Sequence, residues 1–412
     1  MISTASQGMA LEGVRVLDLT IAYNGPFCTM NLADHGAEVI KIERPVTGDG
    51  TRWWPPFREG RTGINDSGYY AFLNRNKKGI TLDLQSEEGK RVFKELVKTA
   101  DVVVNNFKAG TMEKLGLSYE VLKEVNPRII YAATSGFGSY GPFRDRPAYD
   151  IIAQALGGLM SICGYPDGPP VKVGPAVGDN FTGTYLALGI VMALYKRKET
   201  GVGQMVEVAM TDTVVSILEA AIIAYTMTGT MHGRVGNIDP FTTPFDMFRC
   251  KEGDYLVIAA SSDALWEKLC HVMGRPDMLE DERLANIGLR CDNYFSIIEP
   301  VMREWAESHA CGELESMLAD AGIPCAPVLE IDQVVNHPNT RAREMIVKVE
   351  HPTLGTLEIP GIPIKMFGTP GRIRMPSPLL GQHNEEIFGE LDFSDGGEPP
   401  ERQMLCENLQ NN

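Results

Sequence analysis

The stretch of sequence that decides the fold class spans residues 14–43 and reads VRVLDLTIAYNGPFCTMNLADHGAEVIKIE. It opens with a short apolar run, Val14 to Leu19, which has the length and composition of a buried strand. Gly25-Pro26 breaks this run before a helical segment, and Glu38 to Glu43 forms a second apolar run. Strand, helix and strand in so short a segment is the unit from which parallel sheets are built.

The same alternation continues farther along the chain. Apolar residues recur at helical spacing from Glu87 to Thr99, and further strands are predicted at residues 80–84, 101–104 and 129–133. The pattern therefore predicts an α/β fold with a parallel sheet and helices on its faces. Open parallel sheets bind ligands at the carboxyl ends of their strands. The predicted strand ends carry small polar pairs, which are Asn24-Gly25, Asn105-Asn106 and Ser135-Gly136.

The length of the chain, 412 residues, exceeds what one hydrophobic core usually supports, so two domains are expected. After Gly229 the composition shifts to a Gly/Asn/Pro-rich linker, followed by a predicted hairpin at Phe245 to Ala260 and several helical segments. The acidic segment Gly389 to Asn412 is predicted to be a loosely ordered surface tail. The predicted boundaries are a large α/β domain at 1–225, a linker at 226–244, a small α/β domain at 245–325, a linker at 326–340 and a C-terminal part at 341–412 that returns to the large domain.

The composition narrows the classes of function. A net charge of −16 argues against nucleic-acid binding, which needs a basic surface. The eight cysteines show no CxxC pair and the seven histidines no HExxH, so no metal site is expected. The N-terminus lacks the basic and apolar regions of a signal peptide, and no uninterrupted apolar run reaches the roughly 18 residues of a membrane helix. We therefore expect a cytoplasmic enzyme with no membrane partner.

The block GDNFTG, Gly178 to Gly183, is the most informative motif. Asp179 follows a loop rich in Pro and Gly and opens an otherwise apolar helix. The commonest role of such an Asp is to cap the helix, because its carboxylate accepts backbone N–H bonds and interacts favourably with the helix dipole. A carboxylate held ionised against an apolar wall is also a usable nucleophile. The two roles are compatible.

Two loops carry residues that suit a phosphate-bearing or nucleotide ligand. The turn NRNKKG, residues 74–79, holds three closely spaced cations, which suit phosphate but are equally typical of a solvated turn. In the loop NNFKAG, residues 105–110, Phe107 could stack on adenine, although packing at the sheet edge is commoner for such a ring. The signatures of a dinucleotide fold, a P-loop and a serine hydrolase do not occur.

Several blocks in a fixed order resemble the class III CoA-transferases, the family of formyl-CoA transferase and carnitine CoA-transferase. The resemblance runs from about Leu11 to Ile387 and covers nearly the whole chain. The blocks are LEGVRVLDLT, NRNKKGITLDLQSEEGK, DVVVNNFKAGTMEKLGL, NPRIIYAATSGFGSYGP, AYDIIAQALGG, VGDNFTG, ETGVGQMVEVAMTD and SPLLGQHNEEI.

The resemblance implies an architecture, a reaction and partners. The fold would be a large Rossmann-like domain, built from both chain ends, plus a smaller α/β domain, in an interlocked homodimer. The substrates would be an acyl-CoA and a carboxylic acid, with coenzyme A as the group that is moved. Asp179 stands where the family has its nucleophile, which forms an aspartyl anhydride and then an aspartyl-CoA thioester.

The resemblance also implies which residues contact CoA. Arg75 and Lys78 of the basic turn would meet phosphates, and the loop around Phe107 would meet the adenine and ribose. The full set is Ala22, Tyr23, Asn24, Arg44, Arg75, Lys78, Asn106, Phe107, Ala109, Lys114, Phe137, Gly138 and Met210.

Two departures from the family pattern bear on the substrate. Tyr23 stands where formyl-CoA transferase has Gln, and the segment from Gly233 to Thr243 lacks the glycine run that caps the intermediate there. We therefore do not expect oxalate/formate specificity, and the aromatic surface of Tyr23 and Phe137 indicates a larger, less polar acyl group. The identity of the donor and of the acceptor acid cannot be read from these residues.

Two alternatives remain beside the transferase. The α-methylacyl-CoA racemase resembles this chain but uses a His in a G-H-D block as a general base. Here the block reads Ala148-Tyr149-Asp150, and a neutral Tyr is a poor base near pH 7, which favours the transferase. A non-catalytic acyl-CoA-binding protein is the other alternative, and the intact block around Asp179 argues against it.

Overall fold

The computed structural model describes residues 8–239 and 241–391. The chain divides into two compact units, each described here by itself. The first consists of Met1–Gly158, Val173–Glu219 and Pro338–Asn412, and the second of Leu159–Lys172 and Ala220–His337. The predicted domain boundaries, with linkers at 226–244 and 326–340, stay a prediction. The expectation of a loosely ordered tail falls mostly on residues 392–412, which lie outside the described residues.

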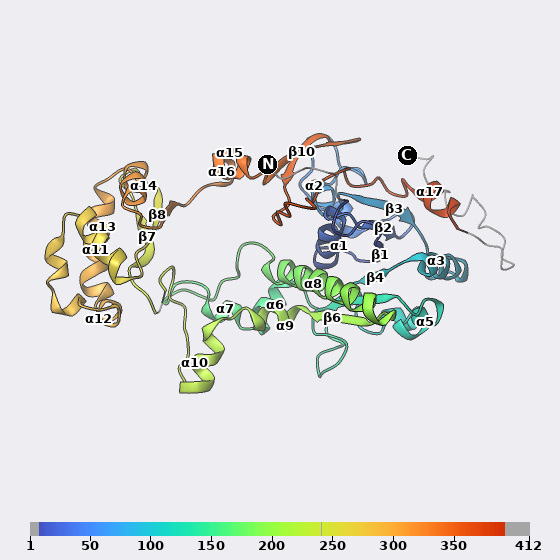
Figure 1. Cartoon of the computed structure of the whole chain (residues 1–412), viewed down its shortest axis with the longest axis horizontal. Coiled ribbons are helices and arrows are strands. Elements are labelled where there is room, and N and C mark those ends of the chain that lie inside the picture. Colours follow the sequence, from blue (N-terminus) through green and yellow to red (C-terminus); the bar gives the residue numbers. More distant parts are fainter. Residues whose placement is uncertain (1–7, 240, 392–412) are drawn as a thin grey trace. The chain divides into compact units, whose positions relative to one another are not determined.

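The first unit is built on a six-stranded sheet with the order β3-β2-β1-β4-β5-β6, and every neighbouring pair is parallel (Figure 1). The predicted parallel α/β fold is confirmed. The order reverses between β1 and β4, which makes their carboxyl ends the switch point where such sheets bind ligands. The last strand was not anticipated from periodicity, and β3 begins earlier than the predicted 80–84. The strands are β1 (Arg15–Asp18), β2 (Glu38–Glu43), β3 (Lys77–Thr81), β4 (Val102–Asn105), β5 (Ile130–Ser135) and β6 (Met205–Ala209).

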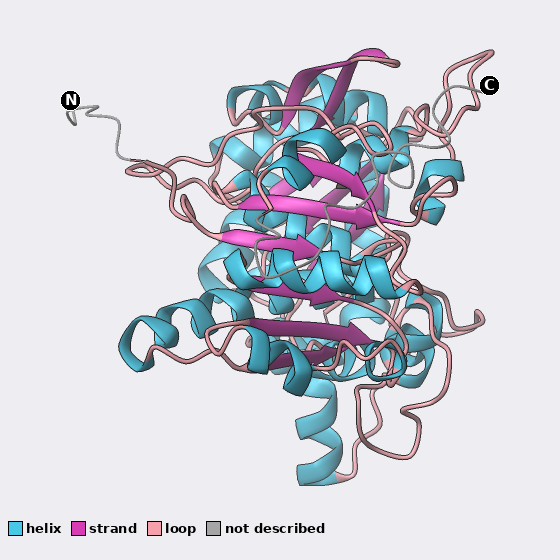
Figure 2. Cartoon of the chain, turned by 90° about the vertical axis from the view of Figure 1, so that its right-hand side faces the viewer, coloured by secondary structure: helices cyan, strands magenta, loops and turns pink. Residues whose placement is uncertain are grey.

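Helices cover both faces of this sheet (Figure 2). Alternate strand residues point to opposite sides, so Val16 and Val39 pack in one apolar core and Leu17 and Ile40 in another. The valine side is covered by α1 (Asn24–Asp34) and α8 (Val177–Thr200), and the other side by α3 (Glu87–Thr99), α4 (Thr111–Lys114) and α5 (Tyr119–Val125).

The helix α3 matches its predicted bounds because its start is encoded locally. The Ser86 side chain caps it by accepting the Gly89 N–H, and Glu87 and Glu88 occupy its first turn, where the helix dipole favours negative charge.

The helix α8 is long and apolar enough to span a membrane by length and composition alone, with a mean hydropathy of 1.2. The bent pair α9 (Met210–Ser216) and α10 (Ala220–Thr228) also passes this test if counted as one span. Along α8, Leu186, Ile190 and Ala193 are buried in the core on the valine side of the sheet. A core helix of a globular protein has this kind of apolar stripe.

The C-terminal part of the described chain packs along the outer strand β3. The Thr81 N–H donates to Asn384 Oδ1 at 2.9 Å, and the Gly79 N–H donates to His383 Nδ1 at 3.0 Å. Residues from both ends of the sequence therefore contribute to the first unit. Its other elements are the 3-10 helix Gly50–Trp53, α2 (Gly68–Leu73), α6 (Asp150–Leu156), α16 (Pro338–Ala342), β10 (Ile346–His351), β11 (Gly355–Pro360) and α17 (Asn384–Gly389).

The second unit has its own core around a three-stranded antiparallel sheet, β7-β8-β9. The predicted hairpin at Phe245 to Ala260 is confirmed as β7 (Phe245–Arg249) and β8 (Tyr255–Ala259), and β9 is Cys325–Pro327. The helices of the unit are α7 (Leu159–Ile162), α10, α11 (Asp263–Val272), α12 (Ile287–Asp292), α13 (Glu299–Glu307), α14 (Cys311–Asp320) and α15 (Ile331–Asn336), with short turns at Pro276–Leu279, Glu282–Leu284 and Tyr294–Ile298.

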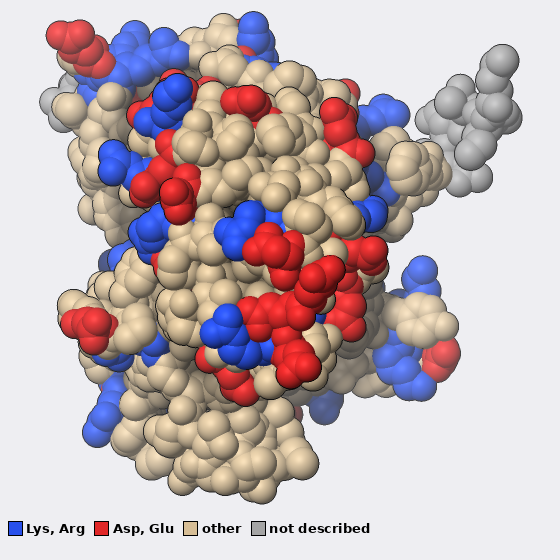
Figure 3. All heavy atoms as spheres, turned by 90° about the vertical axis from the view of Figure 1, so that its left-hand side faces the viewer, with Lys and Arg blue, Asp and Glu red and all other residues tan. Residues whose placement is uncertain are grey.

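The excess of acidic over basic residues is visible on the surface (Figure 3). On the face shown in Figure 3, Asp and Glu side chains gather into a patch, and some Lys and Arg side chains lie at its edge. This distribution accords with the net charge of −16.

Candidate active site

Asp179 lies in the first turn of α8, but it is not the residue that caps the helix. The N-cap residue is Ala176, whose side chain makes no capping bond. Asp150, the first residue of α6, takes that role from a distance: its Oδ1 accepts the Gly178 N–H at 2.8 Å and, more weakly, the Asp179 N–H at 3.4 Å. The interpretation of Asp179 as a helix cap is therefore wrong, and its carboxylate is left for other contacts.

A buried glutamine holds Asp150 in place. Gln154 Nε2 donates to Asp150 Oδ2 at 2.6 Å, and Gln154 Oε1 accepts the Val173 N–H at 2.9 Å. The glutamine is 0% exposed. One face of α6 thus presents a fixed carboxylate to the start of α8, an arrangement that the sequence pattern did not reveal.

The two glycines of the GDNFTG block are required by close approach. A Cβ on Gly178 would stand 2.9 Å from Asp150 Oδ1, and a Cβ on Gly183 would stand 2.5 Å from the Asn24 carbonyl oxygen and 3.0 Å from the Phe27 ring. All three distances lie below ordinary van der Waals contact. The glycines therefore allow α6 and α1 to approach the first two turns of α8 and bring Asp150 and Asn24 to Asp179.

The surroundings of Asp179 make it an unusual carboxyl group. Burial raises its pKa to about 7, the negative charge of Asp150 adds to the rise, and a hydrogen bond from the Asn24 side chain opposes it. None of these influences comes from a cation. A carboxyl group that titrates near neutral pH, unpaired with a cation, is a candidate for chemistry.

Aromatic rings line the approach to Asp179. The Tyr23 hydroxyl donates to Asn180 Oδ1 at 2.8 Å, and its ring lies 5.8 Å from Phe27 and 6.0 Å from Tyr69 between centroids. Tyr69 in turn lies 5.3 Å from Trp54. Burial raises the pKa of Tyr69 to about 12, and Tyr23 and Asp179 contribute to the rise. Tyr69 and Trp54 were not predicted as site residues; the only signal was aromatic side chains in an otherwise polar stretch.

A cavity of about 490 Å³ opens at the carboxyl ends of β1, β2 and β3. Two predicted CoA contacts from different loops line it together, the exposed Arg44 after β2 and Phe107 after β4. The location is the one expected for a ligand on this sheet topology. Other lining residues include Ile21, Lys41, Gly48, Leu82, Gln85, Thr111 and Leu115.

The turn after β1, between this cavity and Asp179, contains the predicted residues Ala22 and Asn24. The predicted residue Asn106 holds this turn from the loop after β4. Asn106 accepts the Ile21 N–H at 2.8 Å and donates to the Ile21 carbonyl at 2.6 Å and to Asn24 Oδ1 at 2.9 Å. Ala22 has φ 62°, a left-handed conformation that is uncommon outside glycine, and its N–H bonds to Asp49 Oδ1 at 3.3 Å. The loop after β4 therefore fixes the turn after β1.

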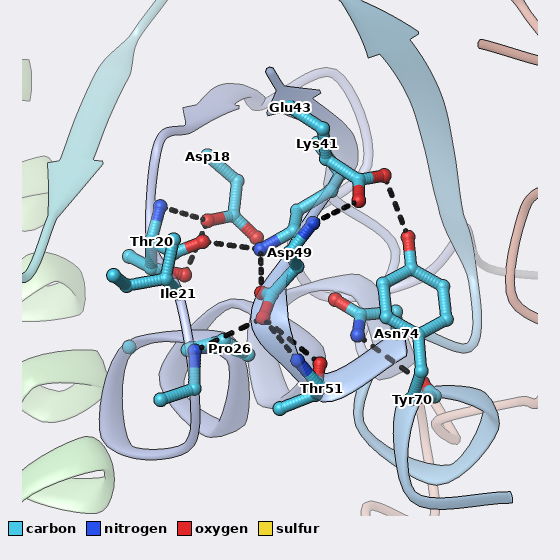
Figure 4. A network of polar contacts seen from close by, with 12 residues as sticks. Asp18, Thr20, Ile21, Pro26, Lys41, Glu43, Asp49, Thr51, Tyr70 and Asn74 are labelled. Atoms are coloured by element: carbon cyan, nitrogen blue, oxygen red, sulfur yellow. Dashed lines mark hydrogen bonds and ion pairs between the residues drawn. The ribbon is translucent and has the colours of Figure 1, made fainter. Parts of the chain in front are cut away.

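Buried charged side chains hold this turn in place through hydrogen bonds (Figure 4). Lys41 Nζ donates to Asp49 Oδ2 at 2.9 Å and to the Thr20 carbonyl, and Lys77 Nζ donates to Asp18 Oδ2 and to the Pro26 carbonyl, both at 3.0 Å. All of these ionised side chains are nearly or fully buried. The two lysines bind carbonyl oxygens on either side of the strained turn, so the network holds the start of α1 in place.

The basic turn does not join the cavity. Arg75 is 1% exposed and pairs with Asp34 at 2.7 Å, and Lys78 pairs with Glu38 at 2.6 Å and Glu386 at 2.7 Å. Both cations lie at the amino end of β3, whereas the cavity lies at the carboxyl end of that strand. The prediction that Arg75 and Lys78 meet phosphates does not fit this placement, because carboxylates already occupy them.

The remaining predicted contacts are dispersed. Ala109 lines a small cavity of about 40 Å³, and Phe137 lines a separate cavity of about 460 Å³. Lys114 is exposed on α4, and Gly138 has φ 80° in the turn after β5. Met210 is buried beside Gly178, where its Cγ is 3.6 Å from the place of a Cβ.

Tyr149, at the position of the racemase base, is 75% exposed, and it is not among the groups that shift the pKa of Asp179. Among residues 8–239 and 241–391, no three His, Cys, Asp or Glu side chains are grouped so that they could hold a metal ion.

Comparisons with known proteins match the chain over nearly its whole length. The model of CoA-transferase family III matches residues 11–384. A succinyl-CoA:mesaconate CoA-transferase of Haloarcula hispanica is 42% identical over 94% of this chain and 98% of its own, and a succinyl-CoA–D-citramalate CoA-transferase of Chloroflexus aurantiacus is 37% identical over 92% and 94%. The crystal structure of a CAIB/BAIF family protein from Brucella suis is 35% identical, with a TM-score of 0.82 over 94% of this chain and 100% of that one.

Proposed function

The chain belongs to CoA-transferase family III, and we propose that it moves CoA from an acyl-CoA to a carboxylic acid through covalent intermediates on Asp179. The observation that carries the proposal is the setting of this carboxylate. It titrates near neutral pH, has no cationic partner, and lies beside the Asn24 amide and an aromatic wall.

The first half of the reaction loads the enzyme with CoA. One Asp179 oxygen attacks the thioester carbonyl carbon, and the C–S bond breaks, which gives a mixed anhydride and the CoA thiolate. The thiolate then attacks the Asp179 carbonyl carbon and the anhydride C–O bond breaks. The products are an aspartyl-CoA thioester and the free donor carboxylate.

The second half runs the same steps in the opposite sense. The acceptor carboxylate attacks the aspartyl thioester and displaces the CoA thiolate, and the thiolate attacks the acceptor carbonyl of the resulting anhydride. Asp179 is released as a carboxylate, and no net proton or electron is exchanged. Each step trades one activated acyl bond for another, so the thioester free energy is retained.

The aromatic wall supports this chemistry by limiting access of water. Anhydride and thioester both hydrolyse, and hydrolysis would end the transfer. The rings of Tyr23, Tyr69 and Trp54 form a continuous edge-to-face series beside Asp179. The wall also lacks cations that would pair with the nucleophile.

For CoA we propose that the nucleotide end occupies the cavity at the carboxyl ends of β1 to β3. Arg44 would pair with phosphate and Phe107 would stack on adenine, two interactions that suit these side chains. The turn Ala22 to Asn24 lies between this cavity and Asp179 and would guide the pantetheine arm toward the carboxylate.

For the acid we propose a short dicarboxylic acid with some hydrocarbon surface. Mesaconate and D-citramalate, which stand in the names of two relatives, are methyl-branched dicarboxylic acids. A methyl group suits the aromatic wall of Tyr23 and Tyr69 better than oxalate does, in line with the expectation of a less polar acyl group.

Trapping the aspartyl thioester tests the proposed reaction. After incubation with succinyl-CoA, intact-mass spectrometry should show a CoA adduct on the wild type, and hydroxylamine should convert it to a hydroxamate at Asp179. Asp179→Ala should form no adduct and lose at least about a thousandfold in transfer rate. Asp145→Ala, which removes an exposed carboxylate, is the matched control and should behave as the wild type. Full transfer activity in Asp179→Ala would overturn the mechanism.

We also propose a cytoplasmic homodimer that binds neither nucleic acid nor membrane. Exposed apolar side chains on α8, among them Leu188, Val191 and Met192, give a second copy a surface to cover. The acidic surface and net charge of −16 disfavour nucleic acid. Mass photometry at nanomolar concentration should show a dimer, and a monomer there would contradict the proposed assembly.

A further inference from the structure

We infer that Asp150, held by Gln154, is a positioning residue for Asp179: it takes the N–H groups at the start of α8 and places a fixed negative charge beside Asp179, so that transfer depends on pH. The inference rests on the proposed function, because it concerns the same nucleophile. It assigns a role to two residues that touch no substrate.

The first support is the position of the Asp150 carboxylate. Its Oδ1 lies 2.8 Å from the Gly178 nitrogen, at the start of the helix that carries Asp179. Unsatisfied N–H groups at a helix start normally stabilise a nearby anion. Because Asp150 takes these N–H groups, they are not offered to Asp179, which stands in the same turn.

The second support is the arrangement that fixes Asp150. It accepts from Gln154 Nε2, from the Gly178 N–H and from the Asp179 N–H, so every contact is donated to it. A carboxylate suits this set because it only accepts. Gln154 cannot turn its amide round, since its oxygen is held by the Val173 N–H at 2.9 Å. The buried glutamine therefore keeps a negative charge at this place.

The third support is the inventory of charges around Asp179. Besides α6, the elements packed against α8 carry three acids, Asp34 on α1, Glu207 on β6 and Asp212 on α9, and none of them shifts the pKa of Asp179. The phenols of Tyr23 and Tyr69 face it as neutral groups, and Asn24 gives the one opposing hydrogen bond. Asp150 is thus the charge that controls this site.

The consequence is a definite sign for the pH dependence. Asp179 attacks as a carboxylate, so thioester formation rises with pH as the group ionises. Removing the Asp150 charge lets Asp179 ionise at lower pH. The acidic limb of the rate–pH profile, where the rate of thioester formation rises with pH, therefore moves to lower pH. The carboxylate then becomes less basic, and a less basic nucleophile attacks more slowly on the plateau.

Single-turnover formation of the aspartyl thioester, followed by intact mass from pH 5 to 9, measures this limb directly. Asp150→Asn should move its midpoint down by about one pH unit and lower the plateau several-fold. Asp150→Glu keeps the charge and should retain the wild-type midpoint. Asp212→Asn, on an exposed acid of α9, is the control and should leave the profile unchanged.

A second variant guards against loss of folding. In Asp150→Asn/Gln154→Glu, the new amide donates to the new carboxylate, which still accepts the Val173 N–H. The hydrogen bonds are therefore kept while the charge moves from position 150 to position 154, behind the residue that contacts the start of α8. A lowered midpoint is again expected. An unchanged midpoint in either folded variant would overturn the inference, whereas a thioester formed by Asp179→Ala would overturn the proposed function instead.

Discussion

Two aspartates, Asp18 and Asp179, have little contact with solvent and opposite chemistry. Asp18 ends β1, is 0% exposed, and bonds to Lys77 Nζ at 3.0 Å and to the Thr29 hydroxyl at 2.6 Å. Asp179 opens α8, where its neighbours are the Asn24 amide and the like charge of Asp150. Burial is common to both, so it does not decide what either acid does.

The neighbours decide the ionisation of each acid. Burial alone would raise the pKa of Asp18, but Lys77, Lys41 and the hydroxyls of Thr20 and Thr29 outweigh it and lower the pKa. At Asp179 burial acts in the same direction, and Asp150 adds to it, so the pKa rises to about 7. The first acid is held as a structural anion, and the second is destabilised as an anion, which is the setting expected of a functional carboxyl group.

The largest expected effect is a loss of folding stability when the ion pair between Asp18 and Lys77 is broken. Lys77→Met removes the direct ion pair of the buried Asp18, which keeps only its hydroxyl bonds and the more distant Lys41, and should reduce the free energy of unfolding by about 3–5 kcal/mol. Urea denaturation at pH 7 measures the loss. Burial lowers the pKa of Lys77 to about 8, against the attraction of Asp18, so the lysine is still charged at that pH.

The control for Lys77→Met is a pair on the surface. Lys196→Met breaks the exposed pair of Lys196 with Glu199 at 2.7 Å and should cost no more than about 0.5 kcal/mol. A loss in Lys77→Met as small as in this control would show that the buried pair contributes no stability.

The second effect should have the opposite sign. Asp179→Asn removes a carboxylate that folding makes harder to ionise, and it should raise the free energy of unfolding by up to about 4 kcal/mol at pH 8. The pKa of Asp179 is higher in the folded than in the unfolded protein. The wild type therefore loses folding stability, relative to the variant, as the pH rises from about 4 to about 7. The gain should therefore fall below half at pH 5. Urea titrations at both pH values test it, and a variant less stable than the wild type at pH 8 would contradict the account.

The smallest effect should come from the hydrogen bond that favours ionised Asp179. Asn24→Ala removes it and should move the acidic limb of thioester formation up by roughly half a pH unit, opposite in direction to Asp150→Asn. The midpoint, rather than the rate, is the quantity to compare, because Asn24 also accepts from Asn106 at 2.9 Å and its loss affects the turn. A downward shift would show that Asn24 does not stabilise the carboxylate.

The sequence by itself determined the features that depend on neighbouring residues. Period and composition predicted the parallel α/β fold, the helical spacing of apolar residues predicted the bounds of α3, and the hairpin at Phe245 to Ala260 was found from its turn. The order of the blocks identified the family and singled out Asp179. Each of these signals is contained in a few consecutive residues or in their order along the chain.

Only the tertiary structure decided which charges meet. Lys77 pairs with Asp18 across 59 residues, Arg75 with Asp34 across 41, and Asp150 caps Gly178 across 28. The basic turn that suggested a phosphate site is a set of internal ion pairs for this reason. At the start of α8, Asp150 and not Asp179 accepts the free N–H groups, so the Asp179 carboxylate is left for the chemistry that we propose. A charge acts through what lies within a few ångströms of it, and that neighbourhood is set by how strands and helices pack, which no local pattern contains.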